Sequence, residues 1–228
     1  MKVFAINGSP RMKKGNTELV LEPFLQGIRN AGSETEKYYA TALNIQPCSC
    51  GYFYCWDNSP GNCIIDDDMQ MLYPKLKKSD ILVIATPVYT HLPGDLQNFI
   101  NRLLPLMNPK LEMREERTRI RLRDNVNIKK IVLVSVCAWW EMGNFETVEK
   151  IIQELSKTTS VEYAGALLRP HAYMMSNQGN PTKDGKKILE YAKQAGTELI
   201  KEGTMHKETL NKISRPLISK EQYMIPHN

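Results

Sequence analysis

The chain has 228 residues, 42% of them hydrophobic and 24% charged, which is typical of a globular protein with one α/β domain. A formal net charge of +5 is too small to indicate nucleic acid by itself, and it would suit an anionic small molecule equally well. We expect no membrane partner, since no apolar run approaches the roughly 20 residues that span a bilayer. The N-terminus enters a short strand rather than a signal peptide, so the sequence predicts a cytoplasmic protein.

Hydrophobic patterning predicts strands and helices that alternate along the chain. Largely apolar runs predict strands at 2–7, 81–86, 130–137 and 161–168, and residues 35–41 are expected to form a second, edge-like strand. Helical spacing of apolar residues predicts helices at about 17–31, 66–78, 94–104, 145–157 and 184–202. Pro23 lies within the first helix, where it removes an internal hydrogen bond, so we expect a kink or a local break there.

This alternation favours a parallel sheet with helices on both faces. No internal repeat or linker divides the sequence, and we expect one domain over residues 1–203 with a C-terminal extension over 204–228. The extension is weakly periodic and is predicted to lie over a surface, its own or a partner's. A charged excursion over 108–128 mixes basic and acidic residues. It is either a solvated surface or a contact to a partner subunit or an anion.

Three loops of unusual composition follow predicted strands, at 8–17, 87–94 and 138–144. In an open α/β sheet, ligands bind beyond the carboxyl ends of the strands, so we expect these loops to share one edge. The first loop starts a helix, whose N–H groups and dipole favour an anion such as a phosphate monoester. Its candidate phosphate ligands are Ser9, Arg11, Asn16 and Thr17.

The spacing of the first loop excludes two common phosphate motifs. It matches neither a Walker loop nor the GxGxxG pattern of a dinucleotide site. An ordinary polar loop with helix-capping residues is the alternative to a phosphate site.

Aromatic residues mark the second and third loops. Tyr89 follows the third predicted strand, and Trp139 and Trp140 follow the fourth. Adjacent side chains diverge at a strand end, so we expect one tryptophan to cover a planar ligand and the other to enter the core or an interface. Core packing is the alternative for all three aromatics. The convergence of three loops at one edge favours a flat aromatic ligand with a phosphate tail.

Four segments carry a resemblance to a known family: "GSPRMKKGNT", "IIDDDMQ", "ATPVYTHLPGDLQNFINRL" and the strand ending at "VCAWW". Together they resemble the flavodoxin-like NADPH-dependent FMN reductase family, and more narrowly its iron-sulfur flavoprotein branch. The resemblance runs from residue 1 to about residue 203. It implies a three-layer α/β/α sandwich with a five-stranded parallel sheet, and a structural role for Arg102.

The resemblance also implies an FMN site. The phosphate would be held by Ser9, Arg11, Asn16 and Thr17. The ribityl chain and the isoalloxazine ring would contact Pro87, Val88, Tyr89 and Thr90. The third loop would flank the ring with Ala138, Trp139, Trp140 and Gly143. No catalytic residue is assigned; His91 is a candidate donor to substrate or flavin, with a solvated histidine as the alternative, and His171 is a weaker candidate.

A predicted insertion over 47–65 contains four cysteines with the spacing C-x-C-x4-C-x7-C. Iron-sulfur flavoproteins usually show a compact C-x2-C-x2-C followed by a later cysteine, and the first two cysteines here are out of step with that pattern. Three interpretations stay open: a [4Fe–4S] cluster, a zinc site, or free or redox-active thiols. The four candidates are Cys48, Cys50, Cys55 and Cys63.

The resemblance implies an FMN-dependent oxidoreductase that passes electrons from NAD(P)H, or from a reduced carrier, to a small acceptor such as a quinone or a flavin. One alternative is an iron-sulfur flavoprotein that transfers single electrons and receives them from a carrier such as ferredoxin. Another is a flavin-binding redox sensor without turnover. Relatives are commonly dimers or tetramers, so we expect a homodimer or a homotetramer.

Overall fold

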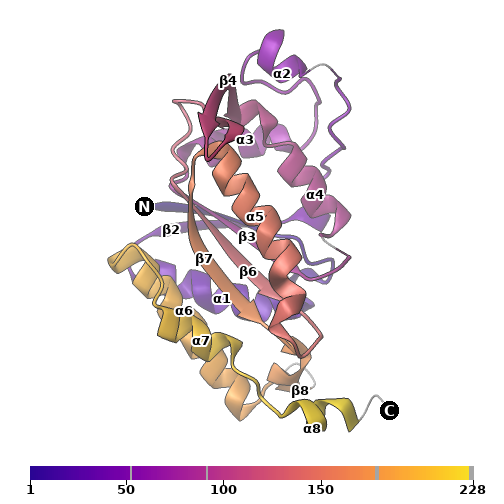
Figure 1. Ribbon diagram of the computed structural model, residues 1–228, viewed down its shortest axis with the longest axis vertical. Coiled ribbons are helices and arrows are strands. Elements are labelled where there is room, and N and C mark those ends of the chain that lie inside the picture. The colour runs from indigo at the N-terminus through magenta and orange to yellow at the C-terminus, as the bar shows by residue number, and fades with distance from the viewer. Residues whose placement is uncertain (52, 91, 178–179, 226–228) are drawn as a thin grey trace.

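Parallel strands form the central sheet of the protein, seen in a computed structural model that describes residues 1–51, 53–90, 92–177 and 180–225. The strand order is β2-β1-β3-β6-β7, so β1 and β3 are neighbours at the point where the order reverses (Figure 1). The strands are β1 (Lys2–Asn7), β2 (Glu34–Tyr39), β3 (Ile81–Pro87), β6 (Lys130–Val136) and β7 (Glu162–Arg169). Every neighbouring pair is parallel, so the carboxyl ends meet at one edge.

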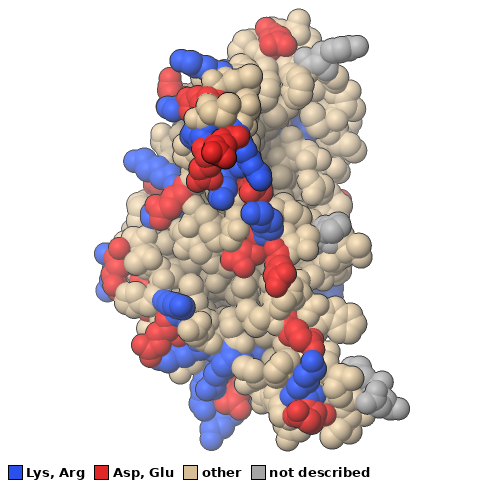
Figure 2. Space-filling model, in the orientation of Figure 1, with Lys and Arg blue, Asp and Glu red and all other residues tan. Residues whose placement is uncertain are grey.

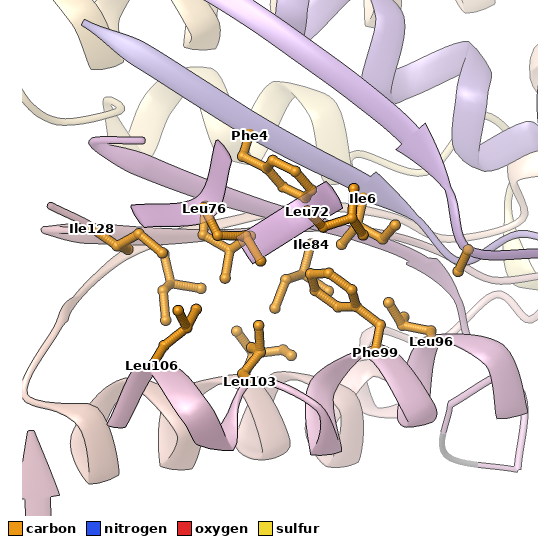
Figure 3. Close-up of a cluster of buried hydrophobic side chains, with 14 of the residues drawn as sticks. Phe4, Ile6, Leu72, Leu76, Ile84, Leu96, Phe99, Leu103, Leu106 and Ile128 are labelled. Carbon is orange, nitrogen blue, oxygen red and sulfur yellow. The ribbon is translucent and has the colours of Figure 1, made fainter. Parts of the chain in front are cut away.

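Helices cover both faces of this sheet. One face carries α3 (Met69–Lys78), α4 (Gly94–Asn101) and α5 (Glu146–Thr159), and the other carries α1 (Asn16–Asn30) and α6 (Lys183–Lys201) (Figure 1). Because strand side chains alternate between faces, Phe4 and Ile6 pack in one core cluster and Val3 and Ala5 in the other. Figure 3 shows the first cluster, which joins strand, α3 and α4 side chains. The predicted three-layer α/β/α sandwich is confirmed.

Helices α1 and α6 approach each other closely at two glycines. A Cβ atom at Gly27 would lie 1.9 Å from the carbonyl oxygen of Lys193, and one at Gly196 would lie 2.1 Å from that of Phe24. Helix α1 continues without interruption through Pro23, so a local break, one of the two predicted forms, is wrong, and the kink stays a prediction. The helix therefore tolerates the one internal hydrogen bond that proline cannot make, next to a residue, Phe24, whose backbone lies close to α6.

An antiparallel hairpin of β4 (Met107–Arg114) and β5 (Arg117–Leu122) occupies most of the charged excursion. Its turn residues Glu115 and Glu116 have φ of 50° and 58°, as a two-residue hairpin turn requires. Arg119 is buried and donates to Glu154 of α5 at 3.0 Å, so part of the excursion packs on its own chain. On the face drawn in Figure 2, basic and acidic side chains are interspersed.

The remaining elements are short or lie near the C-terminus. They are α2 (Tyr54–Asp57), the paired β8 (Ser176–Asn177) and β9 (Asn180–Pro181), α7 (Lys207–Ser214) and α8 (Lys220–Met224). Single 3-10 turns span Met12–Lys14, Ala40–Ala42, Leu104–Leu106, Met142–Phe145 and Ala172–Met175. The extension lies over the chain's own surface, with α7 against α6 and β7 (Figure 1). Among the described helices, none has the length and apolar character to cross a membrane.

Candidate functional site

The turn after β1 is fixed by the buried side chain of Asn7. Its Oδ1 accepts a hydrogen bond from the Ser9 backbone N–H at 2.8 Å, and its Nδ2 donates to Glu18 at 2.9 Å. The Gly8 backbone N–H donates to the Ala85 carbonyl of β3 at 2.8 Å. The loop is therefore tied to both β3 and α1, and these bonds give it a defined shape without a ligand.

The first turn of α1 presents polar groups that the chain does not use. The Thr17 hydroxyl is buried and has no hydrogen-bond partner in the described part of the chain. Gly15, the N-cap of α1, has no side chain to accept from the N-terminal N–H groups. A Cβ atom at Gly15 would lie 2.5 Å from Ser9 Oγ, so any larger residue would fill this space. An unpartnered buried hydroxyl at a helix N-terminus fits a bound phosphate.

These groups line a cavity of about 240 Å³ at the carboxyl edge of the sheet. Its described lining residues are Ser9, Arg11, Gly15, Asn16, Thr17, Pro87, Val88, Tyr89, Val136, Cys137, Ala138, Ala172 and Tyr173. The structure thus brings the first loop, the second loop and the start of the third loop together, as the sequence predicts. We call this space the phosphate cavity.

A larger cavity of about 680 Å³ adjoins the phosphate cavity and shares Val88 and Tyr89 with it. Its described lining residues are Pro10, Val88, Tyr89, Thr90, Leu92, Pro93, Gly94, Asp95 and Trp139. The side chains of Tyr89 and Trp139 are 51% and 58% exposed, so two aromatic surfaces are available to a planar ligand. We call this space the ring cavity.

Trp140 and Gly143 do not appear among the described lining residues of either cavity. The indole N–H of Trp140 donates to the Ile218 carbonyl at 3.1 Å, so this tryptophan packs on the C-terminal extension. Gly143 lies in the 3-10 turn before α5. The adjacent tryptophans diverge, with Trp139 at the ring cavity and Trp140 at the extension. A cofactor contact by Trp140 or Gly143 stays a prediction.

Two residues of the phosphate cavity, Ala172 and Tyr173, are missed by the sequence patterns. They follow β7, and applying the carboxyl-end rule to the fifth predicted strand would have found them. Cys137 also lines this cavity, and burial raises the pKa of its thiol to about 11. Of the two candidate histidines, His171 is buried within the protein, and His91 lies outside the described residues.

The four cysteines of the insertion lie close enough for the charge of one thiolate to affect the pKa of another. Burial, followed by the charges of Cys50, Cys63 and Cys48, raises the pKa of Cys55 to about 11. Burial and the neighbouring Cys50 also raise the pKa of Cys48. None of the four forms a disulfide within the described part of the chain. Among the described residues, no group of three or more His, Cys, Asp or Glu side chains could hold a metal ion, so the thiols as placed do not fit a cluster or a zinc site.

A buried ion pair links the end of α4 to Asp67, two residues beyond this insertion. The Arg102 guanidinium donates to both carboxylate oxygens of Asp67, at 2.6 and 3.0 Å, and to Cys63 Sγ at 3.3 Å. Burial opposes ionisation of Asp67. The bonds from Arg102 and from the backbone N–H groups of Gln46 and Met69 outweigh it and lower the Asp67 pKa. Both terminal nitrogens of Arg102 thus have partners in its own chain, whereas its Nε has none among the described residues.

The strand order β2-β1-β3-β6-β7, with cavities beyond the carboxyl ends of β1 and β3, defines a flavodoxin-like fold. Within this class, the chain belongs to the NADPH-dependent FMN reductase family, which matches residues 1–177.

Curated relatives in this comparison are named iron-sulfur flavoproteins. One from Archaeoglobus fulgidus is 36% identical over 107 residues, which are 46% of this chain and 46% of the relative. One from Methanosarcina thermophila is 31% identical over 118 residues, which are 51% of this chain and 59% of the relative. The chain therefore spans about half the length of the curated relatives it matches.

Solved structures of low sequence identity share the fold. An NAD(P)H:quinone oxidoreductase from Methanothermobacter marburgensis is 17% identical, with a TM-score of 0.58 over 87% of this chain and 96% of that one. An FMN-dependent NADH-azoreductase from Bacillus anthracis, solved in complex with FMN, is 12% identical, with a TM-score of 0.59 over 89% and 99%. At such identities the likeness shows the fold alone.

Proposed function

We propose that the protein is an FMN-dependent oxidoreductase that passes electrons from NAD(P)H to a small acceptor such as a quinone or a flavin. The buried, unpartnered hydroxyl of Thr17 carries this proposal, because it lines a cavity at the N-terminus of α1. Membership of the FMN reductase family supports the same function.

The first loop would hold the FMN phosphate. Thr17 and Ser9 would donate hydroxyl hydrogen bonds, Asn16 its side-chain amide, and the first N–H groups of α1 would add their dipole. Arg11 is exposed and would supply charge from the rim of the cavity. The phosphate would thus satisfy the hydroxyl that the protein alone leaves unpaired.

The wall between the two cavities would carry the rest of the cofactor. The ribityl chain would pass along Pro87, Val88, Tyr89 and Thr90, and the isoalloxazine ring would enter the ring cavity. Ala138 and Trp139 would flank the ring. Bound FMN would supply the hydride and electron chemistry, and the chain would supply binding and orientation. Because Tyr89 and Trp139 are exposed, a flat acceptor has room to approach from solvent.

This function is tested by titrating flavin-free protein with FMN and with riboflavin, and by assaying NAD(P)H oxidation with a quinone. We expect tighter binding of FMN than of riboflavin, and NAD(P)H oxidation above that caused by free FMN. Failure to bind either flavin would overturn the proposal. Tight flavin binding without NAD(P)H oxidation would favour the redox sensor.

The second candidate is an iron-sulfur flavoprotein that takes single electrons from a carrier such as ferredoxin. The names of the curated relatives favour it, and the insertion cysteines would have to move from their present positions to ligate a cluster. Anaerobic purification followed by iron and acid-labile sulfide analysis tests this candidate. Near four irons and four sulfides per chain would support it, zinc alone would indicate a zinc site, and neither would leave free thiols.

The assembly and the location of the protein are also proposals. We propose a homodimer or a homotetramer in the cytoplasm, without a nucleic-acid partner. Static light scattering of the full chain tests the assembly, and a mass near the 26.1 kDa of one chain would contradict it.

A further inference from the structure

Residues 215–225 fold back over the carboxyl end of the sheet, and we name this segment the C-terminal strap. It follows α7 and contains α8, at the lower end of the molecule in Figure 1. It lies outside residues 1–177, which match the family. The strap contacts the third loop: the Tyr223 hydroxyl donates to the Ala138 carbonyl at 3.2 Å, and the Lys220 ammonium pairs with Glu141 at 2.7 Å.

A buried guanidinium anchors the start of the strap to β7. Arg169 donates to the carbonyl of Ile213 at 2.7 Å and to that of Arg215 at 2.8 Å. Its Nη2 lies 2.8 Å from His171 Nε2, which also accepts from the Leu217 N–H at 3.0 Å. Since both partners of Nε2 are donors, His171 is neutral here. Burial, followed by the charge of Arg169, lowers its pKa to about 4.

The strap lies against two residues of the phosphate cavity, Ala138 and Tyr173. The ring centroids of Tyr223 and Tyr173 lie 6.4 Å apart, and Tyr173 lines the phosphate cavity with Ala138. Ala138 directly precedes Trp139 of the ring cavity. Strap residues themselves are not among the described lining residues. The strap therefore contacts the residues that form the walls and leaves the cavities to a ligand.

We propose that the C-terminal strap positions the third loop for the flavin ring, with Tyr223 and Lys220 as positioning residues. This inference rests on the proposed function, since it assigns the strap to the same site. These two contacts are made to the third loop, at Ala138 and Glu141, rather than to the first loop over Ser9–Thr17. The Ala138 carbonyl that accepts from Tyr223 belongs to the peptide bond that leads to Trp139 of the ring cavity. Loss of the strap should therefore weaken FMN and riboflavin by the same factor.

The test compares Tyr223→Phe and Lys220→Ala with two matched controls. Tyr163→Phe removes a hydroxyl that donates to Glu149 at 3.0 Å, and Lys212→Ala removes an exposed ion pair with Glu208 of 2.7 Å. We expect Tyr223→Phe to weaken both flavins roughly 2- to 10-fold, as for the loss of a hydrogen bond. We expect a smaller equal effect from Lys220→Ala and unchanged affinities in both controls. A chain ending at residue 216 should lose at least about 10-fold for both flavins.

Each outcome decides the proposal. The proposal is supported if the strap variants lose the same factor of affinity for FMN and for riboflavin, while their unfolding temperatures fall no further than those of the control variants. Unchanged flavin affinities overturn it, even where the truncated chain fails to fold, because the point variants remain. A loss for FMN alone also overturns it, since the strap would then act on the phosphate. Wild-type protein that binds neither flavin overturns the proposed function and this inference together, whereas the results above affect the strap alone.

Discussion

The first loop and the cysteine-containing insertion are both rich in polar side chains, yet their polar groups have different partners. The Thr17 hydroxyl in the first loop region is buried without a partner among the described residues. Beside the insertion, Asp67 accepts two bonds from Arg102 and one each from the backbone N–H groups of Gln46 and Met69. Other buried polar atoms, such as Arg102 Nε, also lack a partner among the described residues, but Thr17 additionally lines a cavity. The candidate ligand site is thus marked by an unused polar group that lines a cavity, rather than by the number of chemically versatile residues.

The largest expected effect is on stability, and it comes from replacing Asp67, the buried partner of Arg102. Asp67→Asn should lower the free energy of unfolding by about 3–5 kcal/mol, because it removes one charge of a buried pair. Both carboxylate oxygens accept from N–H donors, so an amide NH2 group would face a donor in either orientation. Urea denaturation at pH 7 measures the change.

The control for Asp67 is an exposed ion pair. Glu208→Gln breaks the bond to Lys212, and the Glu208 side chain is 80% exposed, so we expect no measurable change in the free energy of unfolding. The Asp67 pKa is lowered in the folded protein, so its contribution is present above the unfolded pKa and is lost as pH falls through the folded pKa. Asp67→Asn should remove that part of the acid dependence. Equal stability of the two variants would contradict the assignment of a buried pair.

The next effect concerns His171, whose internal partners require a neutral ring. Its pKa falls from 6.5 to about 4 on folding, so below pH 6.5 the unfolded state binds a proton that the folded state does not. The free energy of unfolding should therefore fall as pH drops from 6.5 towards 4, by up to about 3 kcal/mol, and then level off. Urea denaturation at pH 7 and pH 5 should show a smaller difference for His171→Gln than for the wild type. An identical pH dependence would mean that His171 is already protonated or exposed.

Thr17→Val should have opposite effects on FMN affinity and on the stability of the flavin-free protein. FMN binding should weaken by about 1.5–3 kcal/mol, roughly 10- to 100-fold, with riboflavin unchanged, because a hydrogen bond to a charged group is lost. The flavin-free protein should gain up to about 1 kcal/mol in stability, because an unpaired buried hydroxyl is removed. Calorimetric titration and thermal unfolding measure the two effects.

A satisfied threonine provides the control for Thr17. The Thr159 hydroxyl is buried and donates to the Leu155 carbonyl at 2.8 Å. Thr159→Val should therefore lower stability by about 1 kcal/mol and leave FMN binding unchanged. If Thr17→Val destabilises the flavin-free protein as much as Thr159→Val does, the Thr17 hydroxyl has an internal partner and the phosphate assignment loses its basis.

The sheet strands and the loops that follow them could be predicted, because they depend on residues close together in the sequence. The sheet strands and the three loops follow from apolar runs and from what comes directly after them, and the 240 Å³ cavity brings those loops together. The diverging tryptophans were also predictable, but Trp140 is oriented by Ile218, 78 positions away in sequence. The place of the insertion depends likewise on the Arg102–Asp67 pair, which joins segments 35 positions apart. Such contacts leave no periodic signal, so the strap and the partners of the cysteines could not be predicted.

The smallest effect, at Arg11, tests where the phosphate lies most directly. Arg11 lines the phosphate cavity but is exposed, so its attraction to a phosphate is screened by water and salt. Arg11→Ala should weaken FMN binding by about 1 kcal/mol, roughly 5-fold, and the loss should shrink as salt is raised from about 50 to 500 mM. Riboflavin has no phosphate and should bind as before. Arg29→Ala, which removes an exposed arginine from the other end of α1, should change neither flavin. Equal loss of FMN and riboflavin in Arg11→Ala would place the phosphate elsewhere, because a charge at the rim acts on the ester and not on the ring.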